Sequence, residues 1–140
     1  MMRDPKSTIG NMIDKAGIAY ITYVDEDGYP QTRAMLPPRE REGIGIIYFT
    51  TNTSSRKVGV FRKYPKACVY FVDKRFYRGV CLNGTIEVSE SQNDKARIWR
   101  DGDERYYPKG VTDPDYCVLK FTAFKGRYYS SFKSEDFDVK

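Results

Sequence analysis

The residues best suited to chemistry lie in one short stretch, Thr50 to Lys57, where hydroxyl side chains run into two adjacent cations. Ser54 or Ser55 can begin a helix here, so Arg56 and Lys57 fall in its first turn. Two cations in a first turn oppose the helix dipole, whose N-terminal end already carries about half a positive charge. A bound phosphate would remove this conflict, because it accepts hydrogen bonds from free backbone N–H groups, hydroxyls and cations. The alternative is a solvated helix start that tolerates both charges.

A strand and a helix hold this stretch in place. Residues 46–49 are β-branched or aromatic, and they predict a buried strand that ends near Thr51. The following helix is expected over residues 56–64, because Pro65 cannot continue it. The polar residues therefore form a corner between the end of a strand and the start of a helix.

A predicted β-hairpin precedes this corner. Residues 18–24 and 29–36 both have the composition of strands, and the acidic turn between them ends in glycine. Side chains alternate along a strand, so Arg33 shares a face with the apolar Met35. An arginine in this position is either an edge residue or a ligand contact, and the strand pattern alone decides neither.

The other predicted elements are mostly strands with short helices between them. Strong strand formers on both sides of Asn83 and Gly84 indicate a bulge at that point. The further predictions are an N-terminal helix within residues 1–17 that ends at Gly17, a charged and solvated connector over 37–43, strands over 67–72 and 79–89, a helix over 90–101, a polar loop over 102–115, a closing hairpin of 116–123 and 127–132, and an acidic surface tail over 134–140.

Strands linked mostly as hairpins predict a mainly β fold with short helices, arranged as an antiparallel barrel or a strongly curved sheet. A chain of 140 residues is long enough for one hydrophobic core, so residues 1–140 are expected to form a single domain. The Rossmann glycine fingerprint and the Walker A loop are both absent from the sequence, which disfavours a parallel nucleotide-binding sheet.

Composition narrows the possible chemistry. The chain contains no histidine, which excludes histidine-dependent nucleophiles and general bases and almost every usual zinc site. Its three cysteines are isolated and match no metal-ligand spacing, so no metal is expected and a bound cofactor would supply any catalysis. The formal net charge of +5 suits an anionic ligand or nucleic acid. The sequence shows neither a signal peptide nor a membrane-spanning run, so a cytoplasmic location is expected.

Three motifs together resemble the FMN-binding split barrel of pyridoxamine phosphate oxidase-like proteins. They are Arg33-Ala34-Met35-Leu36, the stretch FTTNTSSRK over 49–57 and the strand VCLNGTIEV over 80–88. Nearer the C-terminus, Trp99 and the segments YYPKGVTDPDYCVLKF and GRYY are more similar to the short bacterial general stress protein branch of that family. The resemblance covers nearly the whole chain after the first helix.

The resemblance implies a homodimer with FMN at its interface, and it assigns residues of this chain to the cofactor. The phosphate would be contacted by Arg33, Arg56 and Lys57, with Ser55 assisting. The ribityl chain and the flavin ring would lie along Thr50 and Thr51, and beside the backbone of Ala34, Met35 and Leu36. Weaker assignments, contributed from the partner chain, are Arg78, Gly79, Trp99, Tyr106 and Tyr107.

Two departures from the oxidase itself argue against pyridoxamine phosphate as the substrate. Gly79 stands where the oxidase has a glutamine, and the oxidase's C-terminal Arg and Trp substrate segment has no counterpart before Lys140. The resemblance therefore implies an FMN-dependent oxidoreductase whose catalytic residues and substrate the sequence leaves open. A flavin carrier or redox sensor without turnover would have the same residues.

A nucleic-acid-binding barrel is the alternative from a different class. Residues 61–64 and 74–78 interleave cations with aromatic side chains, as surfaces that stack bases and bind phosphates do. With 12 tyrosines and 8 phenylalanines in the chain, however, such neighbours also arise from ordinary strand patterning. Nucleic acid is therefore the disfavoured partner, and flavin absorbance would separate the two classes.

Overall fold

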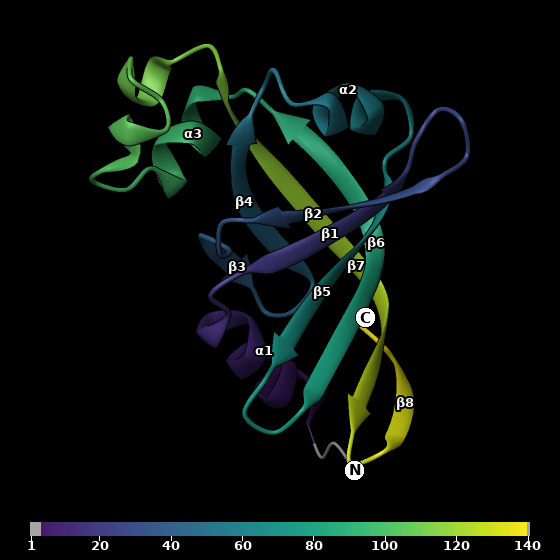
Figure 1. The fold of residues 1–140 in the computed structure, drawn as a ribbon. Helices are drawn as coiled ribbons and strands as arrows, with labels where there is room; N and C mark the ends of the chain where they lie inside the picture. The colour runs from purple at the N-terminus through teal and green to yellow at the C-terminus, as the bar shows by residue number, and fades with distance from the viewer. Residues whose placement is uncertain (1–3, 140) are drawn as a thin grey trace.

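Eight strands of one antiparallel sheet and three short α-helices make up the chain in a computed structural model that describes residues 4–139 (Figure 1). In chain order the elements are α1 (Pro5–Lys15), β1 (Ala19–Val24), β2 (Pro30–Met35), β3 (Glu40–Glu42), β4 (Ile46–Asn52), α2 (Arg56–Lys63), β5 (Lys66–Asp73), β6 (Arg78–Ser89), α3 (Gln92–Ile98), the 3-10 turns η1 (Asp103–Arg105) and η2 (Gly110–Thr112), β7 (Tyr116–Ser130) and β8 (Lys133–Asp138). No helix among the described residues is both long and apolar enough to cross a membrane.

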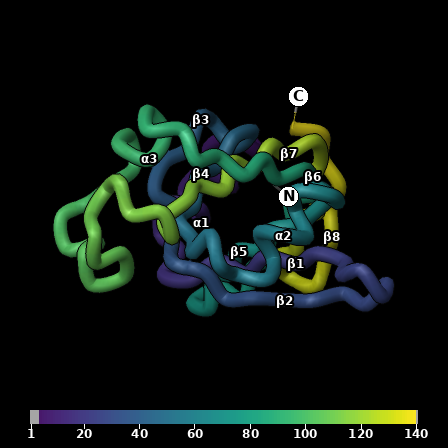
Figure 2. The backbone as a smooth tube through the Cα atoms, turned by 90° about the horizontal axis from the view of Figure 1, so that it is seen from above, coloured from purple at the N-terminus to yellow at the C-terminus, as the bar shows by residue number. Residues whose placement is uncertain are grey.

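The sheet has the strand order β2-β1-β5-β6-β7-β4-β3, and β8 pairs with β7 outside this path. Seen from above, the strands curve around a common centre (Figure 2). Strands β2 and β3 end the path and do not pair with each other in the described part of the chain, so the sheet is not closed. The prediction of a mainly β, antiparallel and strongly curved fold with short helices is confirmed.

Two apolar clusters lie on opposite sides of β4. The main cluster fills the inside of the curved sheet, and α1 contributes Ile9 and Ile13 to it. The smaller one, called the satellite cluster here, lies beneath α3 and the two 3-10 turns and consists of Tyr48, Ile98, Tyr107, Tyr116 and Val118. Side chains of β4 alternate between the two clusters, with Phe49 in the first and Tyr48 in the second.

The N-terminal helix lies within the predicted range and begins with a cap. The Asp4 side chain accepts a hydrogen bond from the backbone N–H of Lys6 at 3.1 Å, and Pro5 is the first helical residue. The helix ends differently, because Ala16 takes an extended conformation with φ −66° and ψ 127°. Gly17 therefore does not supply the left-handed stop that the pattern indicated. Residues 1–3, which fell within this prediction, lie outside the described part of the chain.

The charged connector over residues 37–43 is not a solvated loop. It contains β3, which pairs with β4 in the register Glu40 to Tyr48 and Glu42 to Ile46. The side chain of Arg39 is only 7% exposed and forms an ion pair with Asp103 at 2.7 Å. The prediction failed because the partner of Arg39 lies far along the chain, where local composition gives no sign of it.

The predicted C-terminal hairpin is also wrong. β7 runs without interruption through Phe124, Lys125 and Gly126, and β8 follows it as the outer strand. The turn is instead at Ser131 and Phe132, which have φ values of 51° and 64°. Most of the predicted acidic tail therefore belongs to β8, and Lys140 lies outside the described residues. Gly126 serves packing, because a Cβ there would overlap the Phe137 ring.

The bulge in β6 lies where the sequence predicts it. The register with β7 shifts between Asn83 and Gly84. A Cβ on Gly84 would overlap the carbonyl oxygen of Thr122, so only glycine allows this close approach of the two strands. The predicted helix over 90–101 is shorter, since α3 ends at Ile98 and the two 3-10 turns occupy part of the predicted polar loop.

Candidate functional site

Lys57 is the centre of the candidate site. It lies in the first turn of α2 and is 5% exposed. Its Nζ donates hydrogen bonds to Thr51 Oγ1 at 2.8 Å and to Ser55 Oγ at 2.9 Å. Within residues 4–139 it forms no ion pair with a carboxylate. The structure thus buries a lysine against two neutral hydroxyls, which is an unfavourable arrangement for a cation without an anion nearby.

The electrostatic surroundings of Lys57 also favour an anion beside it. Burial lowers the pKa of Lys57, and the positive charge of Arg33 lowers it further. Both effects disfavour the charged amine. An anion bound beside Lys57 would counter them by neutralising the like charges.

Arg33 reaches this site from β2. It pairs across the sheet with Ile21 of β1, and it shares a face with Met35, as the alternation predicts. β2 is an edge strand of the sheet. On this face Met35 is buried at 8% exposure, whereas Arg33 is exposed. Arg33 is therefore an edge residue that also lies close enough to Lys57 to influence its pKa. The two interpretations left open by the sequence are both compatible with this position.

Arg56 completes the group. It is exposed at the first position of α2, and it makes no ion pair in the described part of the chain. The backbone N–H groups of Arg56 and Lys57 likewise have no acceptor among the described residues. We call Arg33, Thr51, Ser55, Arg56 and Lys57 the cationic corner. Lys57, its two hydroxyl partners and the nearby Arg33 lie together there, and Arg56 precedes Lys57 in the same helical turn. With the free N–H groups, these are the kinds of donor that a phosphate requires.

Two aspartates that the sequence analysis did not single out fix the loops around the cationic corner. Asp115 accepts hydrogen bonds from Ser54 N–H at 2.8 Å and from the Asn52 side chain at 2.9 Å. Asp25 accepts from the backbone N–H of Tyr29 and the amide of Gln31, which lower its pKa, and the charge of Arg56 adds a smaller effect. Each aspartate directly adjoins a strand, at the end of β1 or before β7, and that position was the available signal.

The two predicted flavin-contacting threonines point to opposite sides of β4. Thr51 faces inward and receives the Lys57 hydrogen bond, whereas Thr50 faces the satellite cluster and lies near Tyr107. Only Thr51 therefore joins the cationic corner through its side chain. Ala34 and Leu36 lie on the face of β2 opposite to Arg33, and Ala34 is exposed there.

The predicted aromatic contacts are part of the satellite cluster or its surface. Trp99 packs edge-on against Tyr116 with a centroid distance of 5.3 Å, and Tyr107 is 2% exposed beside both. Tyr106 remains 42% exposed. In this structure Trp99 and Tyr107 serve packing, and a role in flavin binding stays a prediction for all three.

Arg78 and Gly79 lie at the far end of the sheet from α2 (Figure 1). Arg78 forms an ion pair with Asp73 at 2.6 Å. A Cβ on Gly79 would overlap the hydroxyl of Tyr70, so the Tyr70 side chain occupies the space where a larger residue would extend. Within one chain these two residues are not brought to the cationic corner.

The comparison with protein families identifies the relatives of this chain. The model of a family described as pyridoxamine 5'-phosphate oxidase like matches residues 4–138. A curated relative, a pyridoxine/pyridoxamine 5'-phosphate oxidase of Caulobacter vibrioides, is 30% identical over 100 residues, which cover 65% of this chain. The match covers 44% of that relative, so the chain spans less than half of its length.

Solved structures show the same fold. A Clostridium acetobutylicum protein related to general stress protein 26 of B. subtilis, of the pyridoxinephosphate oxidase family, has a TM-score of 0.90 and 35% identity. The match covers 99% of this chain and 97% of that one. A pyridoxamine 5'-phosphate oxidase-related, FMN binding protein from Nostoc punctiforme has a TM-score of 0.74 at 12% identity, covers 99% and 98% of the two chains, and shows likeness of fold alone.

Proposed function

Because the chain belongs to the pyridoxamine 5'-phosphate oxidase-like family, we propose that it is an FMN-binding oxidoreductase whose cationic corner holds the phosphate of the cofactor. The observation that carries the proposal is the burial of Lys57 beside Thr51 and Ser55 with no carboxylate partner in the described chain. The Nostoc punctiforme protein of the same fold is named as FMN binding, which supports the choice of ligand. FMN, when bound, supplies electron transfer at its ring.

The residues of this chain hold and orient the cofactor. Lys57 and Arg56 donate charge-assisted hydrogen bonds to the phosphate from α2, and Arg33 does so from β2. Thr51 and Ser55 hold the Lys57 ammonium in position through their hydroxyls. The exposed backbone around Ala34 offers an edge of β2 for the flavin ring. No side chain is assigned to proton transfer, so a carrier or sensor role remains the alternative to turnover.

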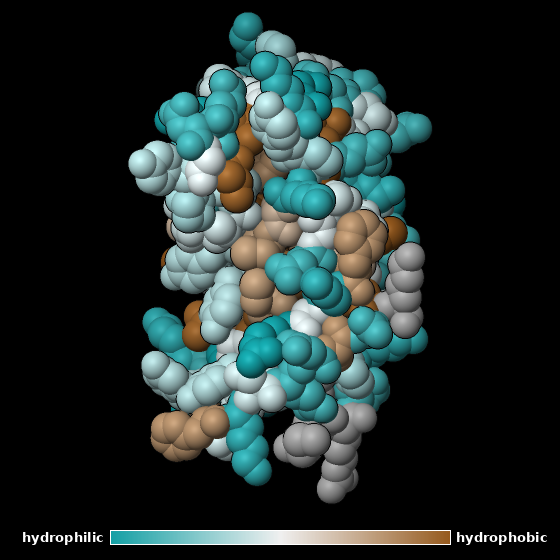
Figure 3. Space-filling model, turned by 90° about the vertical axis from the view of Figure 1, so that its right-hand side faces the viewer, coloured by the Kyte–Doolittle hydropathy of each residue, from teal (hydrophilic) through white to brown (hydrophobic). Residues whose placement is uncertain are grey.

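The proposed assembly is a homodimer in the cytoplasm, formed through the outer face of the sheet. The face carries exposed apolar side chains, among them Val24, Tyr70, Val72 and Phe124 with exposed fractions of 53%, 39%, 42% and 45%. A shallow hollow of about 430 Å³ is lined by two of them, Val24 and Phe124, together with Cys68. One side of the molecule shows apolar side chains gathered between polar ones (Figure 3). Apolar patches bordered by polar residues are typical of protein interfaces.

Sedimentation checks the homodimer. At micromolar concentration we expect a species of twice the 16.3 kDa chain mass, since the exposed apolar face would be covered by a second copy. Replacing Val72 by Lys puts a charge on that face and should shift the equilibrium toward monomers. A single 16.3 kDa species for the unaltered chain would contradict the proposal.

The proposed substrate is not pyridoxamine phosphate. The oxidase that the chain resembles has a glutamine at the position of Gly79, and here a Cβ at that position would overlap the Tyr70 hydroxyl. A glutamine there would require the partly exposed Tyr70 ring to move. This departure supports an electron donor other than pyridoxamine phosphate.

Absorbance tests the flavin proposal directly. Protein purified without added cofactor, or mixed with FMN and desalted, should retain the flavin absorption bands, and riboflavin should be lost on desalting because it lacks the phosphate. Colourless protein after saturation with FMN would refute the proposal. Reduction of the bound flavin by a nicotinamide donor, followed over repeated cycles, would distinguish turnover from carriage.

A further inference from the structure

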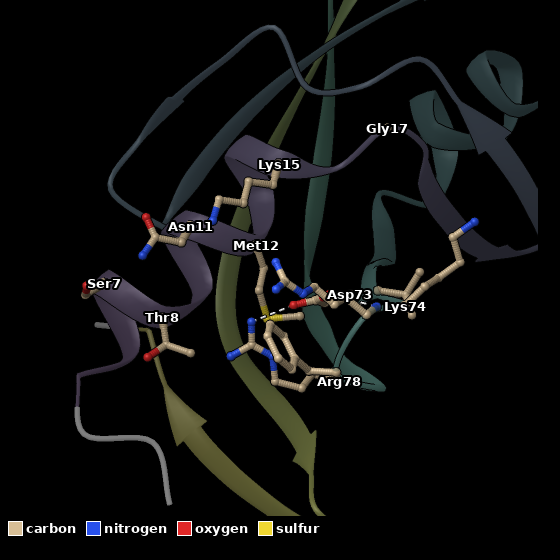
Figure 4. Close-up of a pocket in the computed structure, with 12 residues that line it drawn as sticks. Ser7, Thr8, Asn11, Met12, Lys15, Gly17, Asp73, Lys74 and Arg78 are labelled. Atoms are coloured by element: carbon tan, nitrogen blue, oxygen red, sulfur yellow. Dashed lines mark hydrogen bonds and ion pairs between the residues drawn. The ribbon is translucent and has the colours of Figure 1, made fainter.

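A second cationic cavity lies between α1 and the β5–β6 turn, at the end of the molecule away from α2 (Figure 4). Its volume is about 440 Å³, within the range of small-molecule sites. One wall is a face of α1 with the hydroxyls of Ser7 and Thr8 and the amide of Asn11. The other wall is the turn over residues 73–78, which carries three of the four cations that line the cavity.

The cavity has more cations than it can pair. Its lining includes Lys15, Lys74, Arg75 and Arg78, and among the described residues the single carboxylate of the lining is Asp73. Asp73 is already committed to Arg78 at 2.6 Å. Lys15, Lys74 and Arg75 form no ion pair in the described part of the chain. An anion would therefore find three uncompensated charges here.

The turn over residues 73–78 has an unusual backbone conformation and is held by its own polar contacts. Its four central residues, 74–77, include neither glycine nor asparagine, and Tyr77 takes a φ of 51°, a strained value for an aromatic residue. The Asp73–Arg78 pair closes the turn, and Asp73 also accepts a hydrogen bond from Arg75 N–H at 3.1 Å. A turn selected only to reverse the chain would use residues that avoid this strain.

An aromatic ring lies among the cations. The guanidinium carbons of Arg75 and Arg78 are 5.0 and 5.2 Å from the centroid of the Phe76 ring. Phe76 is 59% exposed, and the Arg78 Nε atom is buried without a hydrogen-bond partner among the described residues. The cavity thus combines an exposed ring and two guanidinium groups beside it with an unsatisfied buried donor. These features suit a planar ligand that also carries negative charge.

We propose that this cavity binds a small organic phosphate ester with a planar ring, separately from the cationic corner. Arg75 pairs with the phosphate from the turn, and Lys15 pairs with it from α1. The Lys74 side chain extends away from α1 (Figure 4) and adds its positive charge to the field at the cavity. The ring packs against Phe76 and the guanidinium planes. The hydroxyl and amide groups of α1 bind its polar edge. This binding rests on the cavity alone and does not depend on FMN occupying the corner.

A mononucleotide tests the proposal, because it has a phosphate and a planar ring and its neutral nucleoside is a matched control. Adenosine 5'-monophosphate is titrated by calorimetry into the unaltered protein and into Lys74→Gln/Arg75→Gln. These two side chains are exposed, so the variant should keep its melting temperature. We expect its affinity to fall at least tenfold, and adenosine to bind at least tenfold more weakly than the monophosphate. Binding should also weaken as salt is raised.

A control variant and FMN-saturated protein distinguish binding in this cavity from binding elsewhere on the chain. Lys63→Gln/Lys109→Gln removes the same charge from exposed lysines that line neither site, and it should leave the affinity unchanged. Protein saturated with FMN should also keep the affinity, and loss of binding there would place the nucleotide in the cationic corner and overturn the proposal. Equal loss in the control variant, no binding at millimolar monophosphate, or binding of a single-stranded oligonucleotide without the mononucleotide would overturn it as well.

Discussion

Replacing Arg56 and Lys57 together by Gln should weaken FMN binding by about two to four orders of magnitude. Each residue is proposed to donate a charge-assisted hydrogen bond to the phosphate, worth about 1.5–3 kcal/mol, and a factor of ten in affinity corresponds to about 1.4 kcal/mol. Lys57 is also buried, so a bound phosphate would interact with it in surroundings that screen charge poorly. Fluorescence titration of the apo protein with FMN measures the loss.

Riboflavin provides the internal control for this experiment, because it has the same ring without the phosphate. Its weaker binding should change less than about threefold in the double variant, since the missing interactions involve only the phosphate. The variant Lys63→Gln/Lys109→Gln removes the same total charge from exposed positions away from the corner and should bind FMN normally. Equal losses for both flavins would remove Arg56 and Lys57 from the phosphate site.

The stability of the apo protein should respond to Lys57 in a pH-dependent way. Burial and the charge of Arg33 place its folded-state pKa below the ordinary value of 10.5. Between these two pKa values the folded chain holds fewer protons at this residue than the unfolded chain does, so the contribution of Lys57 to stability rises with pH. The difference in unfolding free energy between the unaltered protein and Lys57→Gln should therefore shift in favour of the unaltered protein as pH increases, as chemical denaturation at several pH values would show.

The sequence predicted the strand and the helix that form the cationic corner, but it gave no sign that Lys57 is buried. Strand β4 and helix α2 have nearly the predicted bounds, because β-branched residues, polar loop residues and Pro65 are strong local signals. The sequence placed Lys57 in a first turn, either beside a bound phosphate or in a solvated helix start. Its burial depends on Thr51 pointing into the sheet, which follows from the register of β4 with β7 and not from local composition.

The fold shows the same division between local and distant causes. The bulge at Asn83 and Gly84 was predictable, because it interrupts a run of strand formers. The course of β7 through Gly126 was not, since this glycine is explained by the Phe137 ring of the neighbouring strand. A glycine that makes room for a distant side chain has the same appearance in a sequence as a glycine in a turn.

The largest effect on stability should come from breaking the ion pair between Arg39 and Asp103. The two side chains make two hydrogen bonds, of 2.7 and 2.8 Å, and are only 7% and 5% exposed. Replacing Arg39 by Met should lower the free energy of unfolding by about 3–5 kcal/mol, because it leaves the Asp103 carboxylate buried without its partner. Denaturant unfolding followed by circular dichroism measures this change.

Two further variants show whether the loss of stability in Arg39→Met comes from burial of the unpaired carboxylate or only from the removal of a charge. Arg127 and Asp136 form an ion pair of similar length with side chains 61% and 74% exposed, so Arg127→Met should cost less than about 1 kcal/mol. The double variant Arg39→Met/Asp103→Leu removes both buried charges and should recover most of the stability lost in Arg39→Met. A double variant no more stable than Arg39→Met would show that the segment before β3 depends on the ion pair itself.

Lowering the pH should reduce the difference in unfolding free energy between the unaltered protein and Arg39→Met. Burial acts to raise the pKa of Asp103, but the hydrogen bonds from Arg39 and from Arg100 N–H together hold it below 3.8. That contribution is present above pH 3.8 and is lost as the pH falls through the folded-state pKa. Without Arg39 the buried Asp103 carboxyl takes up a proton at a higher pH than it does in the unaltered protein. Protonation removes the cost of the unpaired buried charge in the variant. If the difference in unfolding free energy stays constant between neutral pH and pH 4, water or another cation replaces Arg39 at Asp103.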